Sequence, residues 1–434
     1  MMHSLKETSA IRYRAGDPIT LFEQWSKAGA QQDGLLLVDF QLTAYWREER
    51  SEVPLTAVYL KEAGRVWVSV TNAPLSQPLV SVSELYWHWV EQHDLLAYEL
   101  GQPIGLSALA IPKPWGREIW YTGVEGRGVC ALEHAGQHSP IPWLQAVLPG
   151  SVLGRAGEPL VLLKILDPDP EPVIGDLYFE LHEEKQEVYV VTHIDKAAWP
   201  DGTGYIRMGF ADEKLSQYHG DSAGFRSAYL SSVKAYERVR RQIDAIPEHG
   251  QVDESLREQE SALRTKMDAY SQLRPLRLGD VVKVPLLTPH SLQHGVRTVE
   301  FQTPVYERKI LSFAQEVLTQ SHWDTTEAVE QMHLQTAQPE KFETLFDNDG
   351  VFVERIVDFS DFEVRRVRIS ADAELSLGPM QPYGVIMVVD GRLVLGGQYF
   401  GPEEALIVPR GWSGKLVSDD DSKSVLFLLA IPRH

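Results

Sequence analysis

Two glutamates and two histidines in this sequence have the types and spacing of a metal site. Glu180 and His182 are two residues apart in a segment with a strand pattern, so both side chains can face the same side. Glu187 follows after a short turn and opens the next strand, facing inward, while His290 comes just after Pro285 has ended another strand. Two imidazoles and two carboxylates are a ligand set that suits Zn²⁺, Mn²⁺ or Fe²⁺.

Both segments resemble the two sequence motifs of cupins, which are small jelly-roll β-barrels. The first motif, G-x5-H-x-H-x3–4-E, has a counterpart that runs from Gly175 to Glu187. The second, G-x5-P-x-G-x2-H-x3-N, has a counterpart that begins at Gly279, with Leu287 in place of its second glycine and His294 in place of its asparagine. Two complementary half-motifs in this order predict one metal-binding cupin.

The strands that would position these ligands are short and broken by turns. We expect strands at 161–166, 177–182, 187–193, 205–210, 278–284 and 296–301. A helical insertion of two amphipathic helices, Asp221 to Ile246 and Asp253 to Leu273, separates them into two groups.

The tail of the chain repeats the cupin layout without ligands. Strand patterns recur from Val351 to Ile431, and Asp390-Gly391 has the composition of a hairpin turn. Gly414 occupies the position of the metal-binding histidine, and residues 377–384 contain neither His nor Glu. We therefore expect a degenerate second cupin with a structural role.

The start of the chain has a different pattern and no recognisable motif. Residues 34–40 and 64–70 have strand patterns, and an aromatic-rich helix lies within 75–100. The Pro/Gly-rich stretch 101–114 has the composition of a linker.

The predicted fold class is mainly β, with two cupin domains, a helical insertion and an α/β N-terminal region. The predicted domains are 1–105, of unknown role; 110–330, which binds the metal and contains the insertion at about 221–273; and 345–434, the degenerate cupin.

Composition excludes several classes of partner. A formal net charge of -20 opposes binding to nucleic acid or to an anionic membrane. We expect no secretory signal, and no apolar run reaches the ~20 residues that a membrane span needs. The single cysteine, Cys130, excludes an intramolecular disulfide and is typical of a reducing compartment. We expect a soluble, cytoplasmic protein whose oligomeric state the sequence leaves open.

Residues 110–434 also resemble the type I mannose-6-phosphate isomerases. The phrases that carry this resemblance are Lys113-Pro-Trp-Gly116, Leu162-Leu-Lys-Ile-Leu-Asp167, Glu180-Leu-His182 for the family's Q-x-H, Lys185-Gln-Glu187 for its K-[PT]-E, and Val284-Pro-Leu-Leu-Thr-Pro-His290. The resemblance implies zinc at the four ligands named above and interconversion of mannose 6-phosphate and fructose 6-phosphate.

That reaction moves a proton between two adjacent sugar carbons, so it needs a base as well as cations for the phosphate. By position, the resemblance makes Glu300 the base and Lys185 and Arg308 the cationic groups. Glu180 departs from the family by replacing a neutral amide, and the turn 183–186 replaces a long segment. The added charge of Glu180 should weaken the electrophilicity of the metal. The shortened turn, with Glu183-Glu184 in place of the family's Pro-Asp, remodels the mouth of the pocket and leaves the identity of the sugar open.

Two other functions fit the same residues. One is a non-catalytic, sugar-sensing or regulatory cupin whose N-terminal region engages a protein partner. The other is a different cupin metalloenzyme, such as an oxygenase, since two carboxylates and two imidazoles also hold Fe²⁺. Lys185 and Arg308 favour the phosphosugar isomerase, because an uncharged substrate needs no cationic clamp.

Overall fold

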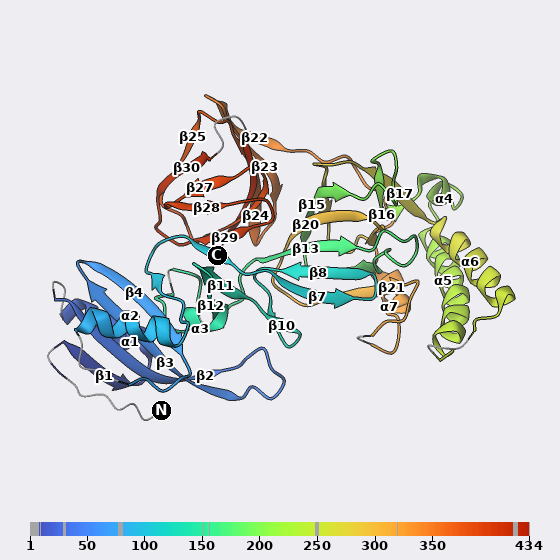
Figure 1. Ribbon diagram of the computed structural model, residues 1–434. Helices are drawn as coiled ribbons and strands as arrows, with labels where there is room; N and C mark the ends of the chain where they lie inside the picture. The colour runs from blue at the N-terminus through green and yellow to red at the C-terminus, as the bar shows by residue number, and fades with distance from the viewer. Residues whose placement is uncertain are drawn as a thin grey trace. The chain divides into compact units, whose positions relative to one another are not determined.

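The computed structural model describes residues 8, 10–28, 32–76, 81–150, 152–155, 157–247, 251–318, 320–419 and 424–433. The chain forms two compact units (Figure 1). Unit 1 contains Met1–Leu109, Trp120–Leu163 and Phe342–His434, and unit 2 contains Ala110–Ile119 and Lys164–Lys341. Both are built mainly of β-strands, which confirms the predicted fold class.

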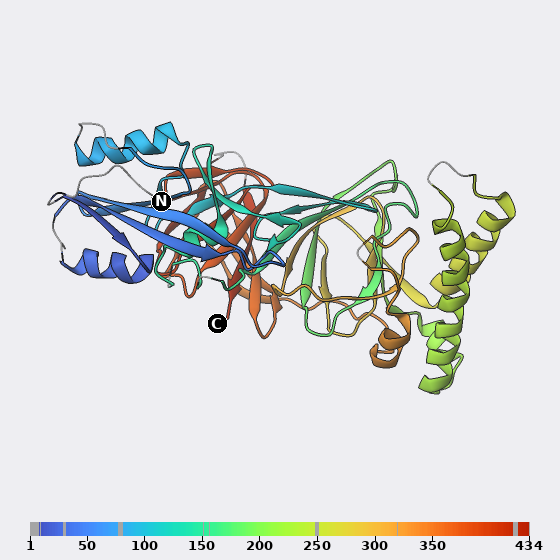
Figure 2. The ribbon, with the colours of Figure 1, turned by 90° about the horizontal axis from the view of Figure 1, so that it is seen from below.

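Unit 1 begins with a five-stranded sheet of order β1-β2-β3-β4-β5. Its elements are β1 (Ile11–Ala15), α1 (Pro18–Ala28), β2 (Gly34–Thr43), β3 (Glu52–Glu62), β4 (Arg65–Thr71), α2 (Val82–Gln92) and β5 (Tyr98–Glu99). The two helices cover opposite faces of this sheet (Figure 2). Leu35 and Leu37 pack in the cluster that contains α2, whereas Tyr59 stacks on Phe22 of α1. Strands buried on both faces explain the unbroken apolar run at the start of β2.

The rest of unit 1 is a two-sheet β domain. Its larger sheet has the order β12-β11-β6-β29-β26-β31-β24-β23-β22, and its smaller one β25-β30-β27-β28. The strands are β6 (Ile104–Leu106), β11 (Ala131–His134), β12 (Gln137–Pro140), β22 (Glu343–Asn348), β23 (Val351–Asp358), β24 (Phe362–Ile369), β25 (Glu374–Leu377), β26 (Gly384–Asp390), β27 (Leu393–Leu395), β28 (Gln398–Phe400), β29 (Ala405–Val408), β30 (Gly414–Ser418) and β31 (Val425–Pro432). Side chains from both sheets, such as Phe427 and Leu416, share one core. Unit 1 also contains β9 (Val124–Glu125), β10 (Gly128–Val129) and α3 (Ile141–Gln145).

Two local predictions are wrong in this region. The stretch 101–114 is not a linker, because it contains β6, which pairs with β11 and β29, and β7 (Leu109–Lys113). Pro112 is tolerated in β7 because β7 is an edge strand. The Asp390-Gly391 turn is not a hairpin, because it joins β26 to β27, and these strands belong to different sheets.

The pairing of β6 also bears on the domain boundaries. Through β6, a segment near residue 105 belongs to the same sheet as the tail. Residues 120–163, which we expected in the metal-binding domain, belong to unit 1. The three-domain division stays a prediction, and the structure groups these segments differently.

Unit 2 consists of two sheets, of order β18-β15-β20-β13-β8-β7 and β17-β16-β19-β14-β21. Its remaining strands are β8 (Gly116–Trp120), β13 (Leu162–Pro168), β14 (Phe179–Leu181), β15 (Glu187–Ile194), β16 (Gly204–Phe210), β17 (Ser271–Leu276), β18 (Val281–Val284), β19 (His290–Leu292), β20 (Val296–Gln302) and β21 (Lys309–Ser312). Consecutive strands β14 and β15 lie in different sheets, so residues 183–186 carry the chain across the sandwich.

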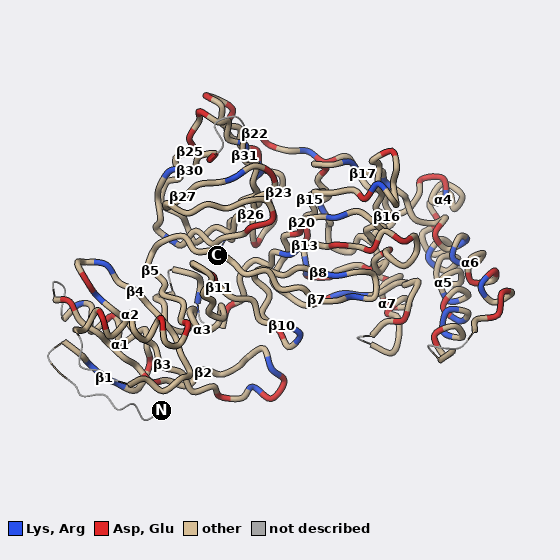
Figure 3. Tube along the Cα trace, viewed as in Figure 1, with Lys and Arg blue, Asp and Glu red and all other residues tan. Residues whose placement is uncertain are grey.

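The predicted helical insertion is present in unit 2. It contains α4 (Asp212–Ser216), α5 (Ser222–Asp244) and α6 (Glu254–Asp268), and a separate short helix, α7 (Thr325–Gln331), follows β21. Asp221 and Asp253 cap α5 and α6, accepting hydrogen bonds from Gly224 N and Ser255 N. Charges of both signs follow α5 and α6 (Figure 3), as expected for helices with a solvated face. Helix α6 ends five residues before the predicted Leu273, because β17 begins at Ser271.

None of the described helices is both long and apolar enough to span a membrane.

Candidate metal centre

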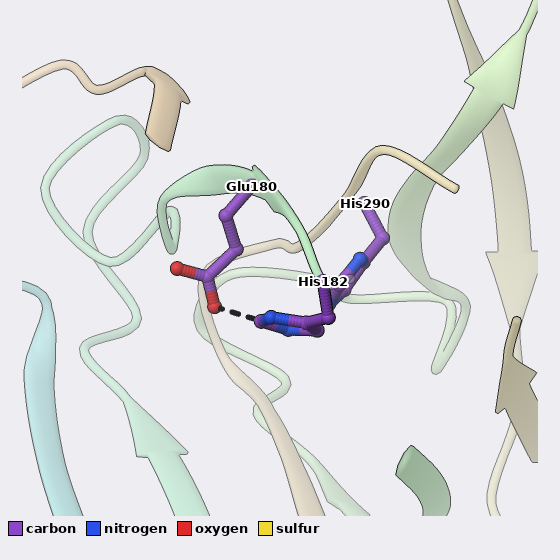
Figure 4. A group of neighbouring side chains, drawn as sticks. All are labelled: Glu180, His182 and His290. Atoms are coloured by element: carbon purple, nitrogen blue, oxygen red, sulfur yellow. Dashed lines mark ion pairs between the residues drawn. The ribbon is translucent and has the colours of Figure 1, made fainter. Parts of the chain in front are cut away.

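Strand pairing brings together residues from the two half-motifs. Glu180 of β14 is directly opposite His290 of β19 in the antiparallel pair, and His182 directly follows β14. One ligand atom from each of the three lies within 4.8 Å of the others (Figure 4). Glu180 Oε1 is 3.8 Å from His182 Nε2. Among the described residues this is the one group of at least three such side chains with that spacing.

Glu187 approaches the same point from the opposite sheet. Its Oε2 is 3.4 Å from His182 Nε2 and 3.3 Å from His290 Nε2. A tetrahedral ion about 2.1 Å from each ligand would separate neighbouring ligand atoms by about 3.4 Å. Glu180, His182 and His290 thus form one group with metal-like spacing, and Glu187 contacts both imidazoles. That these four residues bind one metal stays a prediction.

Backbone contacts select the tautomer of both imidazoles. His182 Nδ1 is 3.0 Å from the carbonyl oxygen of Glu307, and His290 Nδ1 is 3.0 Å from that of Thr288. A carbonyl can only accept, so each Nδ1 carries the hydrogen and each Nε2 has a lone pair. Both Nε2 atoms and Glu180 Oε2 are buried and find no hydrogen-bond partner among the described residues. The two Nε2 lone pairs, which face Glu180 Oε1 and Glu187 Oε2, fit a cation between these atoms.

Glu187 is held in its charged form. Its Oε1 is 2.6 Å from Lys185 Nζ, and its Oε2 accepts a 2.6 Å hydrogen bond from the Tyr189 hydroxyl. Burial raises the pKa of Glu187, but the Lys185 ammonium is the largest opposing cause and the pKa lies well below the usual range. The Lys185 ammonium therefore contacts Glu187, one of the predicted metal ligands, and the Lys185 side chain is 9% exposed.

Arg308 borders the ligand set at Glu180. Its Nη1 is 3.8 Å from Glu180 Oε2, and its guanidinium carbon is 4.4 Å from the centre of the Tyr178 ring. Burial lowers the pKa of Arg308, yet Glu180 and the nearby tyrosines raise it above the ordinary value. Both predicted cations therefore border the ligands, and their contact with a phosphate stays a prediction.

Glu300 belongs to a chain of buried charged side chains. The sequence predicted Glu300 as a site residue but not the other members, Lys164, Glu118 and Lys113. Its Oε2 is 3.3 Å from Lys164 Nζ, and Lys164 Nζ is 3.9 Å from Glu118 Oε1. Glu118 Oε2 is in turn 3.1 Å from Lys113 Nζ. Burial, with added repulsion from Glu187, raises the pKa of Glu300 well above the usual range against the opposing effect of Lys164.

A sequence signal for Lys164 was available. Leu163 and Ile165 on either side of it are fully buried, so by strand alternation Lys164 faces the other side of β13. A lysine in so apolar a strand indicates an ion pair. Its contact with Glu300 depends on β13 and β20 being neighbours, which only the fold shows.

The departures from the cupin motif have structural explanations. Leu287 adopts φ +59°, the left-handed conformation that favours the glycine it replaces. Its N–H donates to the His182 carbonyl over 2.7 Å, which ties the two half-motifs together. His294 does not contact His290 through its ring, because its Nδ1 is 2.7 Å from Asp176 Oδ1 and its ring stacks on Trp199.

Several solved structures share this fold at low sequence identity. Mannose 6-phosphate isomerase from Bacillus subtilis matches with a TM-score of 0.54 and 13% identity, covering 76% of this chain and 99% of that one. A point variant of phosphomannose isomerase from Salmonella typhimurium matches with a TM-score of 0.55 and 11% identity, covering 77% and 100%. A zinc-bound mannose 6-phosphate isomerase matches with a TM-score of 0.54 and 12% identity, covering 76% and 100%. At these identities the likeness shows the fold alone. No protein-family model matches the sequence, and no curated protein matches it either.

Proposed function

We propose that this protein is a metal-dependent aldose–ketose isomerase that acts on a phosphosugar, with mannose 6-phosphate as the first candidate. The observation that carries the proposal is the pair of buried imidazoles whose Nε2 lone pairs face Glu180 and Glu187. The similar fold of solved mannose 6-phosphate isomerases supports it.

Glu180, His182, Glu187 and His290 would hold the metal. Zinc is the first candidate, because one structure of similar fold contains it, and Mn²⁺ and Fe²⁺ suit the same ligands. When bound, such an ion polarises sugar oxygens as a Lewis acid.

Charge balance in the site favours a phosphorylated substrate. Four basic groups (Lys113, Lys164, Lys185, Arg308) are matched by four acidic ones (Glu118, Glu180, Glu187, Glu300). The raised pKa of Glu300 favours its neutral form, which leaves three charged acidic groups and an excess of one positive charge before any metal binds. A divalent cation would then leave an excess of positive charge, which a sugar phosphate would offset.

Glu300 is the proposed base. Isomerisation removes a proton from one of two adjacent sugar carbons and returns it to the other, and one carboxylate can do both. A glutamate whose pKa lies above its ordinary value is suited to exchanging a proton near neutral pH. Lys164, 3.3 Å away, would orient Glu300 and stabilise its charged form.

The test is a coupled isomerase assay with elemental analysis of the same sample. We expect about one metal ion per chain and conversion of mannose 6-phosphate to fructose 6-phosphate. His290→Ala should lose both metal and activity, whereas His322→Ala, which alters a histidine that is 71% exposed, should retain them. A fully metal-loaded wild type that isomerises no phosphosugar would refute the proposal.

A non-catalytic, sugar-sensing function is the second candidate. Glu187 already engages Lys185 and Tyr189, and Glu180 places a second carboxylate beside it. The Glu180 carboxylate reduces the electrophilicity expected of a bound metal, and the contacts of Glu187 with Lys185 and Tyr189 compete with its binding of a metal. Binding of mannose 6-phosphate without turnover would favour this alternative.

A further inference from the structure

Unit 1 contains a second candidate ligand site, separate from the metal centre in unit 2. A pocket of about 630 Å³ is formed where β4, α2, the β11–β12 turn and the β27–β28 turn meet. Its volume is within the range of about 300–1,000 Å³ typical of small-molecule sites. A hydrogen bond joins two lining residues, since Gln398 Nε2 donates to the Pro103 carbonyl over 2.8 Å.

Aromatic rings form one wall of this pocket. Trp67 and Trp87 meet edge to face with ring centres 5.8 Å apart. Trp87 is 39% exposed, although the neighbouring Tyr86 and Trp89 of the same helix are buried. An indole exposed at the wall of a pocket offers an apolar face to a ring-shaped ligand.

Another part of the lining carries amide and imidazole groups in set orientations. Because Gln398 Nε2 faces a carbonyl, Gln398 Oε1 is the atom that faces His134 Nδ1, 3.3 Å away. His134 Nδ1 must then donate, which makes His134 Nε2 an acceptor. Gln137 adds a further amide to the lining. This wall offers both donors and acceptors, as hydroxyl groups require.

The charged residues of the pocket neutralise one another. Arg65 lies over the Trp67 ring at 4.9 Å, and its Nε is 2.8 Å from Glu99 Oε1. An ion pair in this position gives no preference for an anionic ligand. The site therefore suits a neutral molecule.

A smaller pocket of about 190 Å³ continues from the first. The two share His134, Ala135 and Gln398, and the second is also lined by Tyr399, whose side chain is 61% exposed. The two adjoining pockets, with the exposed Trp87 ring and the amides of Gln137 and Gln398 in the first, have room for linked rings. We propose that these pockets, which together we call the Trp87 groove, bind a neutral oligosaccharide.

The experiment is calorimetric titration of the whole protein with maltotriose, cellotriose and α-mannotriose. We expect at least one to bind. Trp87→Ala and Gln137→Ala should each weaken binding by about tenfold or more. Gln137→Ala removes an amide from the lining and leaves the aromatic wall in place. Trp46→Ala should bind as wild type does, because Trp46 lines neither pocket.

His290→Ala should also bind the trisaccharide as wild type does, which separates this site from the proposed isomerase site. Failure of all three sugars to bind would overturn the proposal, as would binding that both Trp87→Ala and Gln137→Ala leave unchanged. Binding of mannose 6-phosphate alone, weakened by Trp87→Ala, would identify an anion site and overturn it as well.

Discussion

Glu180 and His290 are directly opposite each other in the pair of strands β14 and β19. The two halves of the candidate metal site are thus joined by a backbone ladder within one sheet, and Glu187 completes the set from the other sheet. A metal at this point would cross-link the sandwich.

Removing either imidazole should therefore weaken both metal binding and folding. We expect His182→Ala and His290→Ala to lower metal affinity about tenfold or more, since losses of even the supporting hydrogen bonds cost about that much. Metal content is measured by elemental analysis, and the melting temperature with and without chelator reports the coupled stability. Full metal content in both variants would contradict the site.

Lys164 should matter for turnover and not for metal. Lys164→Met removes the cation between Glu118 and Glu300, so the pKa of Glu300 should rise further and the base should be harder to ionise. We expect kcat/KM to fall about 100-fold with metal content unchanged. Lys196→Met, at an exposed lysine, is the control. Equal activity in both variants would remove Lys164 from the mechanism.

Arg308 is the better placed of the two predicted phosphate ligands, because the Lys185 ammonium is 2.6 Å from Glu187. Arg308→Ala should weaken turnover of a phosphosugar about tenfold or more, since a guanidinium can grip phosphate with two hydrogen bonds. KM for mannose 6-phosphate measures the effect, with metal content as the control for folding of the site. An unchanged KM would place the phosphate elsewhere.

Asp167 should stabilise unit 2 in a pH-dependent way. Its carboxylate bonds to Arg297 on β20 at 2.6 Å and to Arg117 on β8 at 2.7 Å, which links three adjacent strands. Burial raises the pKa of Asp167, but the two arginines outweigh it and the net shift is downward. Asp167 therefore contributes its full stabilisation at pH values above its unfolded pKa of about 3.9. This stabilisation is lost as the pH falls through the lower pKa that Asp167 has in the folded protein.

We accordingly expect Asp167→Asn to cost about 1–3 kcal/mol at pH 7. The difference from wild type should shrink as the pH falls below about 4, where wild-type Asp167 takes up its proton. Urea unfolding at several pH values measures this. A difference that does not change with pH would show that the charge of Asp167 is irrelevant.

Gly175, the first residue of the first motif, should tolerate no side chain. A Cβ there would lie 1.8 Å from the Asp169 carbonyl oxygen and 2.8 Å from His294 Cβ. Gly175→Ala should destabilise the protein by about 1–3 kcal/mol, the usual cost of forced overpacking. Gly378→Ala is the matched control, because nothing lies within 4 Å of the Cβ it would add. Similar melting temperatures for the two variants would contradict this explanation.

Much of the fold and the candidate ligands could be predicted from the sequence because they depend on local patterns. Strand alternation located β13, β15, β16 and β20, and the apolar period and aspartate caps located α5 and α6. Motif spacing selected Glu180, His182 and His290, which lie within 4.8 Å of one another, and Glu187, which contacts both imidazoles. Each of these signals is contained within a few residues of chain.

Only the tertiary structure decided which segments become neighbours, because strand pairing joins residues far apart in the chain. The stretch 101–114 has loop composition, yet it forms strands because β29 and β11 offer partners to β6. Lys164 reaches Glu300 because β13 lies beside β20. The Trp87 groove joins residues more than 250 positions apart in the sequence. No local pattern contains these pairings, since they follow from the burial of whole sheets against each other.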